Sequence, residues 1–237
     1  NYGLREGGGF VLLTGEVGTG KTTVSRCLRQ QLPDDTDLAL VVNPTLTERE
    51  LLASICDEFK LSYGTEAGIK ELFDCLRHYL LANRQAGRKT LLLIDEAQHL
   101  SAEVLEQLRL LTNLETDEAK LLQVVLFGQP ELDEKLAQPS VRQLLQRIAF
   151  HYRLFGLNRL EIANYLGHRL RVAGYRGEPL FTSGAVRALE RASGGTPRLV
   201  NILAHKSLLA VFGEGKRQVK AGHVRKAAQD TEGARSP

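Results

Sequence analysis

Glycine, lysine and threonine residues near the start of the chain have the spacing of a phosphate-binding loop. The stretch G-E-V-G-T-G-K-T, from Gly15 to Thr22, matches the pattern G-x-x-x-x-G-K-[ST]. Its glycines let consecutive backbone N–H groups surround a phosphate, and the helix that follows contributes its dipole. Lys21 is expected on the β- and γ-phosphates, and the Thr22 hydroxyl on Mg²⁺. The residues predicted to bind the nucleotide are Gly15, Glu16, Val17, Gly18, Thr19, Gly20, Lys21, Thr22 and Thr23.

Two adjacent carboxylates follow a second apolar run. Asp95 and Glu96 come directly after L-L-L-I, which ends at Ile94. Carboxylates at the end of an apolar strand are costly unless a cation or hydrogen bonds compensate them. We expect Asp95 to bind Mg²⁺ directly or through one of the ligands of the metal, and Glu96 to polarise the attacking water. A solvated strand end is the alternative for this pair alone, but beside a phosphate loop the adjacent acid favours a hydrolase over a kinase.

The elements that must position these residues follow from short apolar runs that alternate with amphipathic stretches. Nearly continuous apolar runs are typical of strands buried on both faces. The alternation predicts a three-layer αβα sandwich with a mainly parallel sheet, which binds its ligand at the carboxyl ends of the strands. The predicted strands are residues 10–14, 38–43, 90–95, 123–127 and 151–155, and the predicted helices are 21–32, 47–59, 66–83, 101–113 and 140–148. The helix over 47–59 carries four acidic residues, so we expect it to face the core and not a membrane.

The last third of the chain has no further strand pattern. Glycine-bearing turns separate four predicted helices, 159–173, 183–191, 197–212 and 221–230, which form a small helical domain. The predicted division is an α/β domain over 1–156, a helical domain over 157–230 and a linker over 231–237.

One of these helices starts with an electrostatic oddity. In G-G-T-P-R, the glycine pair breaks the chain, Thr196 stands at the N-cap and Pro197 at the first helical position. Arg198 then lies in the first turn, where the helix dipole disfavours a cation by about 0.3–1 kcal/mol. We expect either a nearby carboxylate or an anionic ligand to face this arginine.

Composition sets wide limits on function. The chain has 237 residues, 25% charged and 43% hydrophobic, with a net charge of +3. This is ordinary for a soluble protein and too weakly basic to indicate nucleic acid. Cys27, Cys56 and Cys75 lack metal-binding spacing, so buried reduced thiols in a cytoplasmic protein are expected. No apolar run reaches the roughly 18 residues of a membrane span. The chain contains no methionine, so we expect it to be part of a longer protein.

Longer strings resemble a known family. G-E-V-G-T-G-K-T together with L-L-L-I-D-E-A-Q resembles the AAA+ ATPases, P-loop enzymes with a helical lid that usually act as rings. The strings L-L-Q-V-V-L-F-G-Q-P-E-L and G-T-P-R-L-V-N-I-L-A-H-K resemble the MshM-type ATPases of mannose-sensitive haemagglutinin (MSHA) pilus biogenesis, which are related to the ExeA/GspA secretion ATPases. The resemblance runs over nearly the whole chain. It implies ATP and Mg²⁺, an ATP-dependent ring such as a hexamer, and pilus or secretion proteins at the inner membrane as partners.

The resemblance also implies roles for residues outside the two motifs. Gln129 is placed like the sensor 1 residue that orients the attacking water, with a turn-capping hydrogen bond as the alternative. Arg147, and after it Arg142, is placed like the arginine finger that reaches a neighbouring subunit's nucleotide, although either can be an ordinary surface arginine. Arg198 is placed like the sensor 2 arginine on the γ-phosphate. Asn201 and His205 are expected to serve packing and not binding.

Two other functions remain open at this point. A nucleic-acid-linked ATPase of the helicase-loader or transposition-helper type shares the same motifs, and residues 215–226 are densely basic. That stretch lacks aromatic residues for base stacking, so a solvated face or subunit interface is the better interpretation. A scaffold that binds ATP with little turnover is the third hypothesis, and the intact Glu96 argues against it.

Overall fold

The computed structural model describes residues 9–42, 45–116 and 119–235. The chain forms two compact units, the first ending at Leu154 and the second beginning at Phe155. The short segment Val17–Gly20 groups with the second unit, although it lies within the first in sequence.

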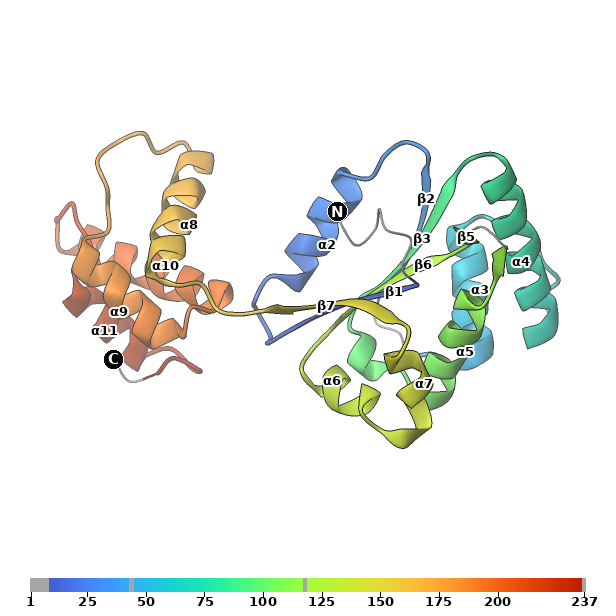
Figure 1. Ribbon diagram of the computed structural model, residues 1–237. Helices are drawn as coiled ribbons and strands as arrows, with labels where there is room; N and C mark the ends of the chain where they lie inside the picture. Colours follow the sequence, from blue (N-terminus) through green and yellow to red (C-terminus); the bar gives the residue numbers. More distant parts are fainter. Residues whose placement is uncertain (1–8, 43–44, 117–118, 236–237) are drawn as a thin grey trace. The chain divides into compact units, whose positions relative to one another are not determined.

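The first unit is built on a five-stranded parallel sheet with the strand order β2-β3-β6-β1-β7. β1 is buried along its whole length, as its apolar run predicts. Because all five strands are parallel, their carboxyl ends share one edge of the sheet (Figure 1). The strands are β1 (Phe10–Gly15), β2 (Thr36–Val41), β3 (Lys89–Ile94), β6 (Gln123–Gly128) and β7 (Ile148–Leu154). All five predicted strands are confirmed, with residue 43 outside the described residues.

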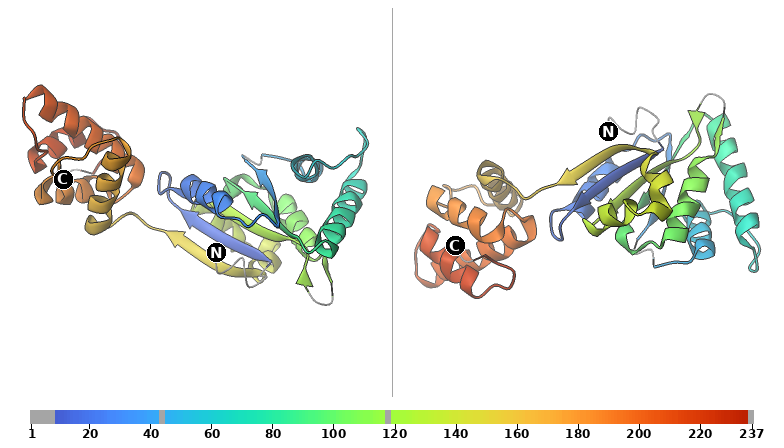
Figure 2. Two further views of the ribbon diagram at one scale, coloured as in Figure 1. Left: turned by 90° about the horizontal axis from the view of Figure 1, so that it is seen from above. Right: turned by 60° about the horizontal axis from the view of Figure 1, so that its bottom comes forward.

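Helices cover both faces of this sheet (Figure 2). Along β1, Phe10 and Leu12 face a core shared with α3, α4 and α5, whereas Val11 and Leu13 face a second core shared with α2. This alternation makes the αβα sandwich that the sequence predicts. The helices are α2 (Lys21–Gln30), α3 (Glu48–Glu58), α4 (Ile69–Gln85), α5 (Ala102–Thr112), α6 (Glu131–Leu136) and α7 (Arg142–Leu145), with 3-10 turns η1 (Ala97–His99) and η2 (Pro139–Val141) and a hairpin of β4 (Glu115–Thr116) and β5 (Ala119–Lys120).

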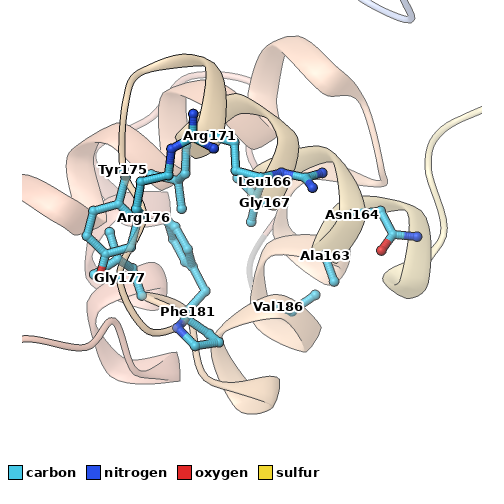
Figure 3. Close-up of a pocket in the computed structure, with 13 residues that line it drawn as sticks. Ala163, Asn164, Leu166, Gly167, Arg171, Tyr175, Arg176, Gly177, Phe181 and Val186 are labelled. Atoms are coloured by element: carbon cyan, nitrogen blue, oxygen red, sulfur yellow. The ribbon is translucent and has the colours of Figure 1, made fainter.

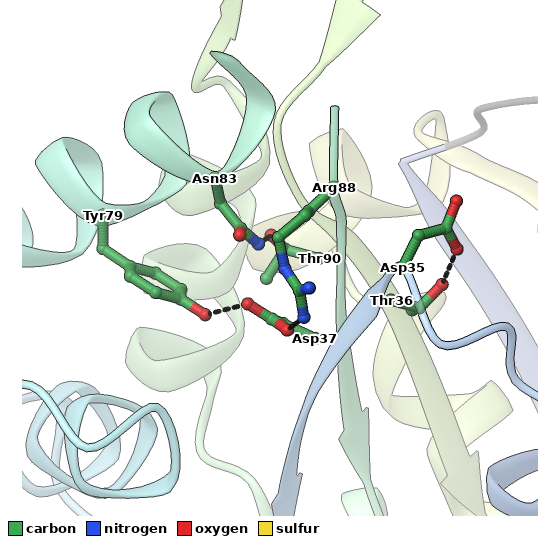
Figure 4. Close-up of polar contacts among 7 residues, drawn as sticks. All are labelled: Asp35, Thr36, Asp37, Tyr79, Asn83, Arg88 and Thr90. Carbon is green, nitrogen blue, oxygen red and sulfur yellow. Dashed lines mark hydrogen bonds and ion pairs between the residues drawn. The ribbon is translucent and has the colours of Figure 1, made fainter. Parts of the chain in front are cut away.

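A polar cluster ties α4 to the amino ends of β2 and β3 (Figure 4). The Tyr79 hydroxyl donates to Oδ2 of Asp37 at 2.6 Å, and the Arg88 guanidinium makes an ion pair with the same carboxylate. Nδ2 of Asn83 donates to Oγ1 of Thr90 at 2.8 Å. The hydrogen bond from Arg88 holds the pKa of Asp37 below its ordinary value. The cluster fixes the edge of the sheet opposite to the strands' carboxyl ends.

The second unit is helical, with α8 (Arg159–Val172), α9 (Ser183–Ser193), α10 (Pro197–Gly213) and α11 (Ala221–Gln229) around one core. A glycine pair precedes α10 because the backbone there adopts positive φ values and passes close to another segment. Gly194 and Gly195 have φ of 57° and 77°, and the Leu157 N–H donates to the Gly195 carbonyl at 2.8 Å. A Cβ on Gly195 would lie 2.3 Å from the Leu157 carbonyl oxygen. No larger residue fits this crossing without a backbone shift.

Two sequence predictions are wrong in detail. The helix expected over 140–148 is a 3-10 turn followed by one turn of α7, because Pro139 opens the segment and β7 already begins at Ile148 to pair with β1. All three cysteines are free, but only Cys56 is buried; Cys27 is exposed on α2. Among the described helices, none is long and apolar enough to cross a membrane.

Candidate functional site

The loops after β1, β3 and β6 bring the predicted chemical groups to the carboxyl edge of the sheet. β1 ends at Gly15, where the phosphate loop begins. Within that loop Gly18 and Gly20 have φ of 80° and 105°, which residues with a Cβ rarely adopt. A Cβ on Gly20 would meet nothing within 4 Å, so its requirement is conformational and not steric. The loop thus has the glycine-dependent backbone that curls N–H groups toward an anion.

Lys21, the first residue of α2, is a buried lysine that makes no ion pair with any carboxylate in the described part of the chain. The residue is 7% exposed, and Nζ donates to the carbonyls of Gly15 at 2.7 Å and Glu16 at 3.3 Å. Within the described residues Nζ forms no ion pair, although a buried ammonium is costly without one. The group therefore fits an incoming phosphate, which would supply the missing negative charge.

Asp95 presents the complementary case, a buried carboxylate that makes no ion pair with any described lysine, arginine or histidine. It is 7% exposed, and burial raises its pKa. The Glu96 N–H donates to Oδ1 at 3.0 Å, and the Thr22 hydroxyl donates to Oδ2 at 3.5 Å. No larger group of metal-binding side chains occurs in the described part of the chain. One carboxylate, one hydroxyl and substrate phosphates are a common Mg²⁺ donor set, so Asp95 and Thr22 fit this metal.

Glu96 is held in place by two amides. Its backbone adopts the left-handed conformation, with φ of 54°. Oε2 accepts from Nε2 of Gln98 at 2.6 Å and from Nε2 of Gln129 at 3.3 Å. These hydrogen bonds, the one from Gln98 first, lower the pKa of Glu96. The Gln129 side chain thus contacts the predicted catalytic acid. The turn after β6 is closed by backbone hydrogen bonds and not by a capping hydrogen bond from this side chain.

Sequence reasoning missed Gln98 and Lys135. Besides contacting Glu96, Gln98 accepts at Oε1 from the backbone N–H of Gln129 at 3.1 Å. It therefore joins the end of β3 to the end of β6. Lys135 on α6 donates from Nζ to the carbonyls of Gln98 and Leu100, both at 2.6 Å. Gln98 stands in the D-E-A-Q string, so its proximity to Glu96 was visible, but its bridging contact was not.

A second polar cluster links β1, α6 and β7 beneath the phosphate loop. The buried Thr14 hydroxyl donates to Oδ2 of Asp133 at 3.3 Å and lies 3.0 Å from Nε2 of His151. Nε2 of His151 is also 3.3 Å from Oδ1 of Asp133, and Arg153 pairs with Oδ2 at 3.3 Å. Asp133 thus connects the segment after Gln129 with the strand that leads into the phosphate loop.

The structure does not bring the two candidate finger arginines to Glu96. Arg142 begins α7 and is exposed, and Arg147 lies just before β7. The amino end of β7 is at the edge opposite to Asp95, so within this unit both arginines lie away from the predicted nucleotide site. Arg147 lines a polar hollow of about 740 Å³ that also contains Arg109 and Lys120.

In the second unit, Arg198 is exposed in the first turn of α10, as its sequence position predicts. Thr196 occupies the N-cap, but its side chain makes no capping hydrogen bond. The Arg198 N–H donates to the carbonyl of Gly18, which groups with this unit, at 3.3 Å. Its guanidinium makes no ion pair with any described carboxylate. Asn201 donates to the Tyr165 hydroxyl at 2.7 Å, a contact within the helical unit that agrees with the expected packing role.

Comparison with known proteins places this geometry in a family. The family model described as "AAA domain" matches residues 4–136. General secretion pathway protein A from Aeromonas hydrophila is 57% identical over 235 residues, which cover 99% of this chain and 43% of that protein. The chain therefore spans less than half the length of this relative.

Solved structures show the same fold at low identity. Cdc6p from Pyrobaculum aerophilum matches with a TM-score of 0.72 and 19% identity, over 96% of this chain and 62% of that one. The RuvB Holliday junction branch migration motor from Thermotoga maritima gives 0.61 and 17%, over 94% and 61%. Such likenesses support the fold alone. With the family model covering more than half of its length and the phosphate loop and acidic pair in place, the chain belongs to the AAA family of ATPases and is related to general secretion pathway protein A.

Proposed function

We propose that this chain hydrolyses ATP with Mg²⁺ and uses the cycle to assemble or remodel a secretion machinery, specifically that of an MSHA-type, type IV pilus. The observation that carries the hydrolytic part is the pair of buried charged groups, Lys21 and Asp95, neither of which makes an ion pair with a described residue, beside an acid held by two amides. The machinery is inferred from the printed name of the 57% identical relative and from the sequence resemblance.

Each side chain has a distinct task in this proposal. Lys21 leaves its two loop carbonyls to bind the β- and γ-phosphates, and Thr22 with Asp95 holds Mg²⁺, which offsets phosphate charge. Glu96 orients the attacking water and accepts its proton. Gln129 places that water, and Arg198 binds the γ-phosphate from the helical unit.

The arginine finger completes the site from a neighbouring subunit. Because Arg147 and Arg142 lie at the sheet edge away from Glu96, we propose that one of them acts on a second copy's nucleotide, with Arg147 first. Mass measurement with and without ATP tests this. Wild type should assemble with ATP. In a phosphate-release assay, Arg147→Ala should lose ATP hydrolysis. Normal ATP hydrolysis by both Arg147→Ala and Arg142→Ala would refute the assignment.

The decisive experiment on hydrolysis is Glu96→Gln. The variant keeps the hydrogen-bonding shape of the side chain but cannot accept a proton, so ATP binding should persist while phosphate release falls by about 10²–10⁴-fold. Glu66→Gln, an exposed glutamate before α4, is the matched control and should behave as wild type. Normal turnover by Glu96→Gln would refute the role of Glu96. Stimulation by DNA, measured in the same assay, would favour the nucleic-acid-linked function instead.

A further inference from the structure

The helical unit contains a cavity that the nucleotide chemistry does not use. It lies between α8 and the segment 173–182 and has a volume of about 480 Å³ (Figure 3). Its lining is mainly apolar, with Leu166, Leu170, Leu180, Phe181 and Val186. A pocket of this size and character is in the range of ordinary ligand-binding sites.

Hydrogen bonds on both sides hold the segment that forms the outer wall. The Tyr175 N–H donates to the Leu170 carbonyl at 2.9 Å, and the Tyr175 hydroxyl donates to the Glu178 carbonyl at 2.8 Å. At the other end, the Val219 N–H donates to the Leu180 carbonyl at 2.7 Å. The cavity is therefore a preformed part of this unit.

A glycine in the middle of α8 forms part of the inner wall. A Cβ built on Gly167 would meet nothing within 4 Å, so no neighbour in this chain requires a glycine there. Glycine inside a helix costs about 0.5–1 kcal/mol relative to alanine. The position thus sacrifices helix stability and leaves open space, as expected where another molecule approaches the helix closely.

The surroundings of the cavity indicate what kind of molecule this is. Arg171 and Arg176 lie along the same side of its mouth, and within the described residues neither makes an ion pair (Figure 3). Two turns before Gly167, on the same face of α8, Leu160 is 70% exposed and extends the apolar surface beyond the cavity. An apolar pocket with a cationic rim and an apolar extension along a helix is complementary to an extended or helical peptide, with an anchoring side chain and an acidic neighbour.

We propose that this cavity is a docking pocket for a segment of a partner protein in which a large apolar side chain stands beside a carboxylate. The side chain enters between Gly167 and Phe181, and the carboxylate pairs with Arg171 or Arg176. All of these residues lie in the helical unit, so the proposal is independent of ATP hydrolysis.

The test is selection of a random dodecapeptide display library on the whole chain without nucleotide. Enriched peptides should carry a leucine or aromatic residue next to aspartate or glutamate. Gly167→Leu fills the cavity and should weaken their binding at least tenfold, without lowering the melting temperature. The double variant Arg171→Glu/Arg176→Glu should weaken binding similarly, whereas Arg187→Glu, an exposed arginine of α9, should not.

Three outcomes would overturn the proposal. These are no enrichment of such peptides, equal binding by Gly167→Leu, and equal binding by the double arginine variant. Self-association of the wild-type chain without nucleotide, abolished by Gly167→Leu, would instead assign the cavity to a second copy. The surface arginine variants keep the test valid if Gly167→Leu folds poorly.

Discussion

Replacing Gln98 with alanine should slow turnover without weakening nucleotide binding. Its amide donates to Oε2 of Glu96 at 2.6 Å and accepts from the Gln129 N–H at 3.1 Å, so it contacts both residues that we propose to position the attacking water. A hydrogen bond to a charged group contributes about 1.5–3 kcal/mol. If the full amount is lost in the transition state, kcat falls about 10- to 100-fold. KM should change little, because Gln98 is not among the proposed phosphate-binding residues.

The same variant should shift the pH dependence of turnover. The Gln98 hydrogen bond is the largest cause of the lowered pKa of Glu96. Its removal raises that pKa, so the base is protonated at a higher pH than in wild type. The acidic limb of the kcat profile should therefore move to higher pH, while the alkaline side is unchanged. A purely structural role for Gln98 would lower activity without moving this limb.

Phosphate release from pH 8 down to about pH 3.5, which lies below the ordinary pKa of a glutamate, measures both effects in one series. Gln138→Ala, an exposed glutamine after α6, is the matched control and should reproduce the wild-type profile. An unchanged kcat in Gln98→Ala, or a reduced kcat with an unmoved acidic limb, would refute the positioning argument.

Three further predictions concern stability and binding. Gly195→Ala should destabilise the chain by at least about 1–3 kcal/mol in thermal melts, because φ is 77° and the new Cβ would lie 2.3 Å from the Leu157 carbonyl; an unchanged melt would contradict this. Asp37→Asn should lose the ion pair with Arg88, and its free energy of unfolding, measured in urea, should fall below that of wild type. Since the pKa of Asp37 is lowered, this difference should be complete at neutral pH and disappear as the pH falls through that pKa. Lys21→Ala should abolish binding of a fluorescent ATP analogue. Without nucleotide, the variant should be at least as stable as wild type, because the substitution removes a buried charge that has no ion pair. A marked loss of stability would show that the contacts of Lys21 with the two carbonyls outweigh the cost of burying its charge.

The sheet and the phosphate loop were predictable because their signals are local. The apolar runs of β1 and β3 read directly as buried strands, and the glycines before Lys21 give the loop its backbone. The adjacent acids needed only the end of β3 to be placed. In each case the decisive residues lie within a few positions of one another along the chain.

Other features depend on pairing between distant segments. Gln98 bridges Glu96 and Gln129 only because β6 is the neighbour of β3, which the local pattern does not state. The start of β7 at Ile148 follows from its pairing with β1, which outweighs the helical pattern of the preceding residues. Helix α6 has only six residues, too few for a clear periodicity.

The strand order also explains how the site keeps its opposite charges apart. β6 lies between β1 and β3, and adjacent strands are about 4.8 Å apart, so the strands that precede Lys21 and Asp95 in the chain are about 10 Å apart. The ammonium of Lys21 favours the charged forms of Asp95 and Glu96, although burial still raises the pKa of Asp95, and it forms no ion pair with either carboxylate. A direct buried ion pair would cost about 3–5 kcal/mol to break. Because Lys21 rests on neutral carbonyls instead, an arriving phosphate has only hydrogen bonds to displace, and the interposed strand is what makes the site receptive.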